Sequence, residues 1–230
     1  MTERQTLLDA IATTIVDYRA GQITPPNAAH VDKWVQQFDP AVQLPMLREL
    51  DHILKKSYFS KAGVLAFLTG LAQTQKLVGS DPGAFWSGVC LLDIQGGGAS
   101  QRELNKELEA VLKKAGMSCA KPGSSITTFI YLDDGLFTGN RILRDIESWI
   151  QNDAPVSCTL HVVVIALHTR GFDYASGKIR QAAKSASKSV NLTWWRAIEL
   201  KDRWMKRLSP TFCIPPPCRR MLPCRHTQVR

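Results

Sequence analysis

The residues with the greatest potential for chemistry in this chain are two adjacent acids, Asp133 and Asp134, and the short polar segment that follows them. The acids end an apolar run at residues 126–132, and an amphipathic segment begins at residue 141. Between them, a glycine lets the backbone turn tightly, while free amides at the positive end of a following helix favour an anion. This order of residues predicts a phosphate-binding loop that contains Thr138, Gly139, Asn140 and Arg141.

Paired carboxylates at the end of a strand have two chemical uses beside a bound phosphate. They accept hydrogen bonds from two neighbouring sugar hydroxyls, or they help to hold a hydrated Mg²⁺. The structural alternative is a capped turn between a strand and a helix, where acids are also common.

The same stretch resembles the phosphoribosyl pyrophosphate motif of type I phosphoribosyltransferases. That motif runs from a hydrophobic strand through Asp-Asp, two variable residues and Thr-Thr-Gly-x-Thr. The acid pair, Thr138 and Gly139 match it without a gap, whereas its first and last threonines are replaced by Phe137 and Arg141. The resemblance implies that Asp133 and Asp134 are catalytic and bind the ribose 2′ and 3′ hydroxyls, and that residues 138–141 surround the 5′-phosphate.

A second flexible segment lies one predicted strand earlier, at residues 95–100, and includes three consecutive glycines. Glycines expose backbone amides that can surround an anion, although such a triplet on its own usually marks a plain loop. The segment stands where the resembled family has its pyrophosphate loop. The resemblance therefore implies a pyrophosphate site formed by Gln95, Gly96, Gly97, Gly98 and Ser100.

Short apolar runs alternate with helical periodicity from about residue 85 onward, which predicts an α/β domain. The run at residues 159–167 is apolar on both sides, as in a strand of a parallel sheet that helices cover on both faces. The expected strands are residues 85–94, 126–132, 159–167 and 190–198. The expected helices are residues 100–115, 141–150 and 174–187. The predicted fold is a parallel sheet flanked by helices, and phosphoribosyltransferase-like by the resemblance.

The N-terminal third has helical periodicity and almost no strand signal. It predicts four helices with short connections, the last capped by Ser60, which form a small bundle or a helix-turn-helix variant. The predicted domains are residues 1–80 (helical), 81–208 (phosphoribosyltransferase-like) and 209–230. The last segment is basic, rich in proline and cysteine, and predicted to be disordered.

Composition limits the class of partner. The net charge is +9, but four arginines and no acid lie in residues 209–230, so the remaining residues carry only +5. A mildly basic chain favours nucleotides and phosphates over extensive nucleic-acid binding. The longest apolar runs are far shorter than the ~20 residues of a membrane-spanning helix, and no signal peptide is recognisable. We therefore expect a cytoplasmic protein without a membrane partner and without a metal site of its own.

We expect the protein to bind phosphoribosyl pyrophosphate or a nucleotide phosphate, together with Mg²⁺ on a pyrophosphate ligand. Whether it also transfers or cleaves the ribosyl group is left open by the sequence. The overall layout resembles phosphoribosyltransferase-like proteins of bacterial defence systems, which implies an anti-phage effector. The alternative is a non-enzymatic adaptor or nucleic-acid-binding regulator that senses a nucleotide, with the helical domain holding a protein or nucleic-acid partner.

Overall fold

The computed structural model describes residues 1–121, 123, 126–201 and 222–223. The chain forms two compact units, Met1–Val64 and Leu65–Arg230. The predicted domain boundary at residue 80 lies after the helices that begin the second unit. Residues 209–230, predicted to be disordered, lie outside the described part of the chain except for a two-residue strand.

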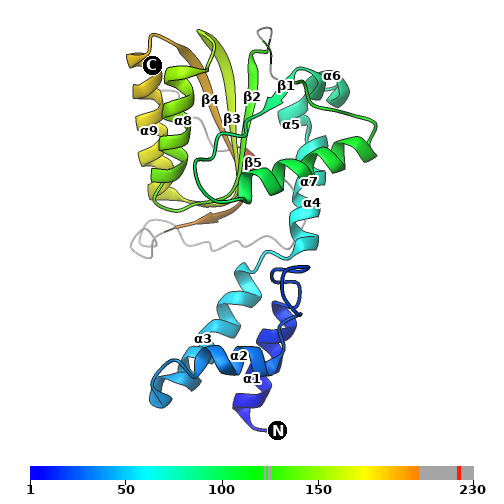
Figure 1. The fold of residues 1–230 in the computed structure, drawn as a ribbon, viewed down its shortest axis with the longest axis vertical. Coiled ribbons are helices and arrows are strands. Elements are labelled where there is room, and N and C mark those ends of the chain that lie inside the picture. Colours follow the sequence, from blue (N-terminus) through cyan, green and yellow to red (C-terminus); the bar gives the residue numbers. More distant parts are fainter. Residues whose placement is uncertain (122, 124–125, 202–221, 224–230) are drawn as a thin grey trace. The chain divides into compact units, whose positions relative to one another are not determined.

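The first unit is helical, as the sequence predicts (Figure 1). Its helices begin at side chains that accept a backbone hydrogen bond, Thr2, Asn27 and Asp39. Leucine, isoleucine and valine side chains from α1, α2 and α3 form one small core. The helices are α1 (Glu3–Thr14), α2 (Ala28–Val35), α3 (Pro40–Ser57) and the start of α4 (Lys61–Gln73), where Ser60 accepts from the Gly63 amide as predicted.

The second unit is an α/β domain, which confirms the predicted fold class. Its strands run in the order β1-β2-β3-β4-β5; β1 to β4 are parallel, and β5 is antiparallel to β4. The strands are β1 (Val89–Leu91), β2 (Thr128–Leu136), β3 (Ser157–His168), β4 (Ser189–Leu200) and β5 (Leu222–Pro223). The helices are α5 (Gln75–Val78), α6 (Pro82–Ser87), α7 (Ser100–Lys114), α8 (Asn140–Asn152) and α9 (Thr169–Ser185).

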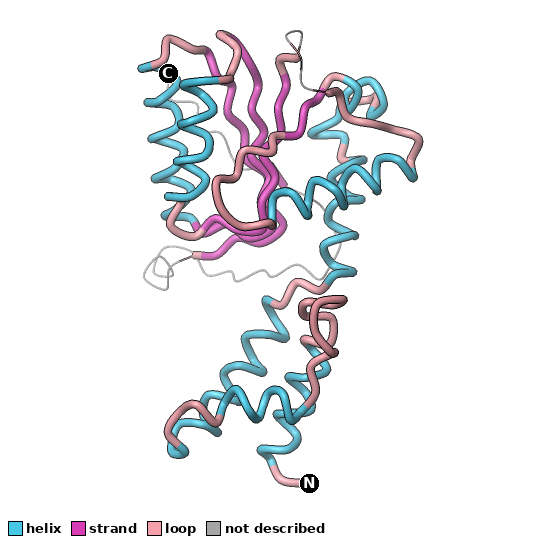
Figure 2. The backbone as a smooth tube through the Cα atoms, in the orientation of Figure 1, coloured by secondary structure: helices cyan, strands magenta, loops and turns pink. Residues whose placement is uncertain are grey.

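The core of this unit lies between the sheet and the helices. Strand β3 is central, and its residues Val162, Val163 and Val164 are all fully buried, as its continuous apolar sequence predicts. Helices α8 and α9 lie side by side along one side of the sheet (Figure 2). No described helix combines the length and the apolar character that a membrane span requires.

The first strand is shorter than predicted. Residues 85–94 were expected to be extended, but Pro82–Ser87 forms α6 and only Val89–Leu91 pairs with β2. The helix is favoured because the Asp81 carboxylate accepts a hydrogen bond from the Ala84 amide at 2.9 Å and a proline occupies the first turn. This strand prediction is therefore wrong over its first part.

The second strand is longer than predicted and includes the two acids. The ladder with β3 continues beyond residue 132, pairing Asp133 with Val164 and Gly135 with Ala166. Consecutive residues of a strand point to opposite faces. The continuation of β2 therefore gives the two neighbouring acids different surroundings: Asp133 is buried and Asp134 is exposed.

Candidate functional site

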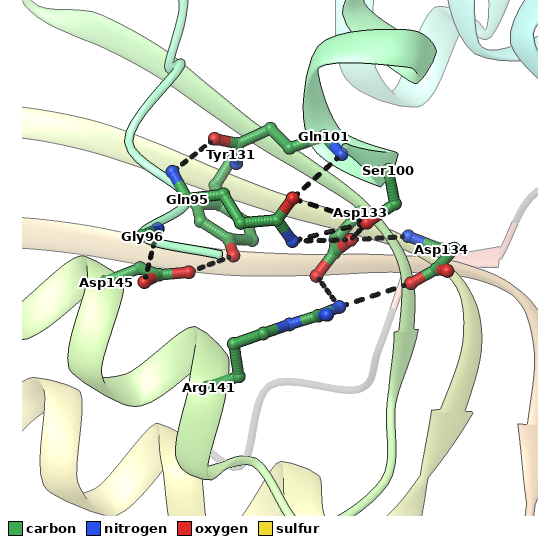
Figure 3. Close-up of polar contacts among 9 residues, drawn as sticks. All are labelled: Gln95, Gly96, Ser100, Gln101, Tyr131, Asp133, Asp134, Arg141 and Asp145. Carbon is green, nitrogen blue, oxygen red and sulfur yellow. Dashed lines mark hydrogen bonds and ion pairs between the residues drawn. The ribbon is translucent and has the colours of Figure 1, made fainter. Parts of the chain in front are cut away.

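Asp133 is the centre of a polar cluster at the carboxyl ends of β1 and β2 (Figure 3). Its side chain is 0% exposed. It accepts hydrogen bonds from the hydroxyl of Ser100 at 2.7 Å, the side-chain Nε2 of Gln95 at 3.4 Å and the backbone N–H of Asp134 at 2.9 Å. A buried carboxylate requires such donors, because desolvation without them is costly.

Arg141, in the first turn of α8, joins the two acids. Its Nη2 atom lies 2.7 Å from Asp133 Oδ2 and 3.3 Å from Asp134 Oδ1. Figure 3 shows both contacts as dashed lines. Burial lowers the pKa of the guanidinium, but the two carboxylates outweigh that effect and hold the pKa above its ordinary value. Arg141, which stands in place of the last threonine of the resembled motif, is therefore already paired with two carboxylates of the protein.

Asp134 is the exposed member of the pair: 62% of its side chain is open to solvent, although its Oδ1 also contacts Arg141. Desolvation raises the pKa of its carboxyl group above the usual value, and the nearby Asp133 carboxylate raises it further. Arg141 acts in the opposite sense. Of the two acids, Asp134 is the one that an incoming ligand can reach without displacing another side chain.

The glycine segment before α7 lies beside this cluster. The amide of Gln95 donates to the side-chain oxygen of Gln101 at 2.9 Å, and that of Gly96 donates to Asp145 Oδ1 at 3.3 Å. A Cβ atom placed on Gly98 would lie 3.9 Å from Arg141 Nη1, whereas one on Gly97 would meet nothing within 4 Å. Two of the amides predicted to hold pyrophosphate are thus used within the protein.

A hollow of about 360 Å³ opens along the segment between β2 and α8. Helix α8 begins at Gly139 without a side-chain cap, so the amides of its first turn have no partner within the helix. The hydroxyl of Thr138 lies 3.4 Å from the Asn140 nitrogen. The hollow is lined by Asp134, Gly135, Leu136, Phe137, Thr138, Gly139, Arg141 and Ile142.

Two glycines fix the position of this segment against α9. Gly139 has a φ of 82°, and a Cβ on it would lie 2.6 Å from the carbonyl oxygen of Gly171. A Cβ on Gly171 would lie only 2.0 Å from the carbonyl oxygen of Phe137. The absence of a side chain at Gly139 thus serves a backbone contact with α9 as well as the tight turn.

A protein-family model, PRTase-CE, matches residues 31–214, which is more than half of the chain. The chain belongs to the PRTase-CE family. This membership confirms the predicted phosphoribosyltransferase-like protein. No curated protein and no solved structure gave a significant match to the chain.

The structure of this PRTase-CE protein brings together most of the residues singled out in the sequence. The acid pair, Arg141, Gln95 and Ser100 share one hydrogen-bonded cluster. The residues predicted to surround a phosphate, except Asn140, line the hollow. Whether these residues bind a ligand stays a prediction.

Three residues of the PRTase-CE site were not predicted from the sequence. Gln101 accepts from the amides of Ile94 and Gln95, and Asp145 accepts from the Tyr131 hydroxyl at 2.8 Å as well as from Gly96. The spacing of Arg141 and Asp145, four residues apart on one helix face, is the signal that could have indicated the acid. Desolvation, the Asp133 carboxylate and this hydrogen bond all raise the pKa of Tyr131.

The described residues of this PRTase-CE protein form no metal cage of their own. Within residues 1–121, 123, 126–201 and 222–223, no three His, Cys, Asp or Glu side chains are grouped to hold a metal ion. Asp133 is engaged by Arg141 and Ser100, whereas Asp134 is exposed. One carboxylate together with substrate phosphates is a common way to bind Mg²⁺. The donor set therefore suits a Mg²⁺ ion that arrives with a pyrophosphate ligand.

Proposed function

We propose that the hollow at residues 134–142 binds the 5′-phosphate of phosphoribosyl pyrophosphate or of a nucleotide. The observation that carries the proposal is the uncapped start of α8 at the hollow, with Arg141 beside it. The positive end of the helix dipole, and first-turn amides that make no hydrogen bond within the helix, favour an anion there. Arg141 adds a guanidinium group, which binds phosphate in a bidentate manner.

In this proposal the two acids have different tasks. Asp134, which is exposed, accepts hydrogen bonds from the ribose hydroxyls and faces Mg²⁺ on the pyrophosphate. Asp133, which is buried, holds Arg141 and Ser100 in place. The amides of Gly97 and Gly98 are the part of the glycine segment that remains for the pyrophosphate group.

The reaction that this arrangement suits is ribosyl transfer. A nucleophilic atom of an acceptor forms a bond to C1 of the ribose, the bond from C1 to the pyrophosphate oxygen breaks, pyrophosphate leaves, and the proton of the acceptor atom passes to solvent; a bound Mg²⁺ would neutralise charge on the leaving group. Asp134 stabilises the positive charge that develops on the ribose, and backbone amides stabilise the charge of the leaving group. The protein itself supplies no covalent intermediate in this scheme.

Isothermal titration calorimetry with phosphoribosyl pyrophosphate and Mg²⁺ tests the proposal. Loss of a charge-assisted hydrogen bond costs about 1.5–3 kcal/mol, so Arg141→Ala should weaken binding by about tenfold or more. Arg144→Ala is the matched control, because Arg144 is an exposed arginine one turn further along the same helix. Absence of binding by the natural protein, or equal affinity in the two variants, would refute the proposal.

A second pair of variants tests the role of Asp134. We expect Asp134→Asn to weaken binding of the magnesium complex, whereas Asp153→Asn, which changes an exposed acid at the other end of α8, should have no effect. Asp133 is a poorer choice for this test because it is fully buried and its replacement would perturb the cluster itself.

We further propose that the helical unit binds a protein partner and that the chain acts as an effector in antiviral defence. Support for a partner comes from Trp34 and Phe38, which are 40% and 39% exposed and whose rings contact each other edge to face. Exposed aromatic pairs are typical of protein interfaces. Co-purification with the natural protein and with Trp34→Ser tests whether the helical unit binds a partner. Phage plaque counts in cells with and without the protein test the role in defence.

A further inference from the structure

Phe137 lines the hollow and is exposed, and binding of a phosphate alone would not explain an exposed aromatic ring there. Its side chain is 61% exposed, although it lies in the segment between a buried strand and α8. Exposed phenylalanine loses the free energy that burial of a large apolar ring would provide. The ring is nevertheless part of the lining of the hollow, next to the proposed phosphate position.

Phe137 makes one close contact through its backbone and another through its ring. The carbonyl of Phe137 packs against Gly171, where no side chain would fit. The ring lies back over Gly135, because a Cβ on that glycine would be 3.0 Å from Phe137 Cε2 and 3.6 Å from Cζ. The Cε2–Cζ edge of the ring therefore lies over the backbone of β2, and 61% of the residue is open to solvent.

Phe137 also lies where it can meet a ligand. Asp134 and Phe137 line the same hollow as Gly139 and Arg141 at the start of α8. A phosphate at the start of α8 and a sugar at Asp134 would thus have an aromatic surface beside them. An aromatic ring held in this way is a stacking platform for any nucleobase, since every base has a π face.

We propose that Phe137 stacks against the base of a nucleoside monophosphate whose phosphate occupies the hollow at residues 134–142. This inference rests on the proposed phosphate site and names the ligand class: a nucleotide with its base attached is preferred over the bare sugar phosphate. Phe137 is a specificity-determining residue in this arrangement, and it acts through contact with the ligand.

The test compares adenosine 5′-monophosphate with ribose 5-phosphate by calorimetry, using the whole chain. Stacking on a protein aromatic contributes enough that the nucleotide should bind the natural protein at least about fivefold more tightly than the sugar phosphate. Phe137→Ala should reduce this ratio towards one, and Phe137→Trp should maintain or increase it. Val156→Ala, at a 72% exposed apolar residue before β3, should leave the ratio unchanged.

Proton NMR of the ligand gives a readout that a change in folding alone would not produce. Stacking on an aromatic ring should move the adenine H2 and H8 resonances upfield with the natural protein and with Phe137→Trp, but not with Phe137→Ala. Phe137→Thr replaces the ring with a hydroxyl that can donate to phosphate. It should bind ribose 5-phosphate as well as the natural protein does, or better, while losing the preference for the nucleotide.

The outcomes separate the two proposals. If neither ligand binds the natural protein, the phosphate site and the stacking platform are both refuted. If ribose 5-phosphate binds but adenosine 5′-monophosphate binds no more tightly, only the stacking proposal fails. A nucleotide preference that persists in Phe137→Ala overturns it as well, whereas a preference that follows the size of the ring through alanine, phenylalanine and tryptophan supports it.

Discussion

Replacement of Gly171 by alanine should be strongly destabilising, because the contact of α9 with the end of β2 leaves no space for a methyl group. The added Cβ would lie 2.0 Å from the Phe137 carbonyl oxygen and 2.7 Å from a methyl carbon of Leu136. Ordinary carbon contacts begin near ~3.5 Å, so the two segments would have to separate by more than an ångström. The nearest atom belongs to the backbone and has no alternative rotamer.

The expected loss follows from the two opposing effects of this substitution. Overpacking of a closely packed contact costs typically about 1–3 kcal/mol, and the backbone clash places Gly171→Ala at the upper end. Alanine in a helix recovers up to about 1 kcal/mol relative to glycine. The net decrease in the free energy of unfolding should be about 2 kcal/mol, which corresponds to a fall of about 4–8 °C in the melting temperature.

Gly177→Ala is the matched control for this prediction. Gly177 lies in the same helix, is exposed, and a Cβ on it would meet nothing within 4 Å. It should therefore raise the free energy of unfolding by about 0.5–1 kcal/mol. Differential scanning calorimetry measures both variants. If Gly171→Ala were as stable as Gly177→Ala, the close approach of the two backbones would be incorrect.

Three further predictions concern buried or half-buried polar groups. Burial lowers the pKa of His161 to about 4. Between pH 6.5 and pH 4 the unfolded chain therefore binds a proton that the folded chain does not, and the free energy of unfolding should fall by about 3 kcal/mol. Urea unfolding of His161→Gln should lack this component. Asp145→Ala leaves the hydroxyl of buried Tyr131 without its partner and should lower the free energy of unfolding by about 1–3 kcal/mol. Asp145→Asn should have a smaller effect. If the alanine variant were as stable as the natural protein, the observed bond would be contradicted. Ser100→Ala removes a donor to Asp133 and should cost about 1–2 kcal/mol in the same assay, and an unchanged value would mean that this bond contributes nothing.

The strands and helices of the second unit were predictable because their hydrophobic patterns are long and regular. Strand β3 could be predicted from its own consecutive apolar residues, and α8 from the helical spacing of its apolar side chains. The misassigned start of β1 had a visible counter-signal, since an acid followed by proline, here Asp81 and Pro82, is typical of a helix start.

The site was predictable only in part, because its decisive contacts join residues far apart in the chain. The sequence places Asp133 and Asp134 side by side but does not show that β2 continues through them and buries only the first. The contact of Gly139 with Gly171 spans a strand and a helix, and no local pattern indicates it. The sequence therefore indicates the types of residue in the cluster, and tertiary packing decides which of them are exposed.

The single guanidinium nitrogen shared by two carboxylates has a consequence for the energetics of binding. An anion that recruits Arg141 leaves Asp134, whose pKa is already raised, without its nearby cation. For an anion bound without Mg²⁺, the pKa of the Asp134 carboxyl should rise further, so the complex should bind a proton more readily than the free protein and affinity should increase as the pH falls towards that pKa. Titrations in two buffers with different heats of ionisation would measure this uptake directly.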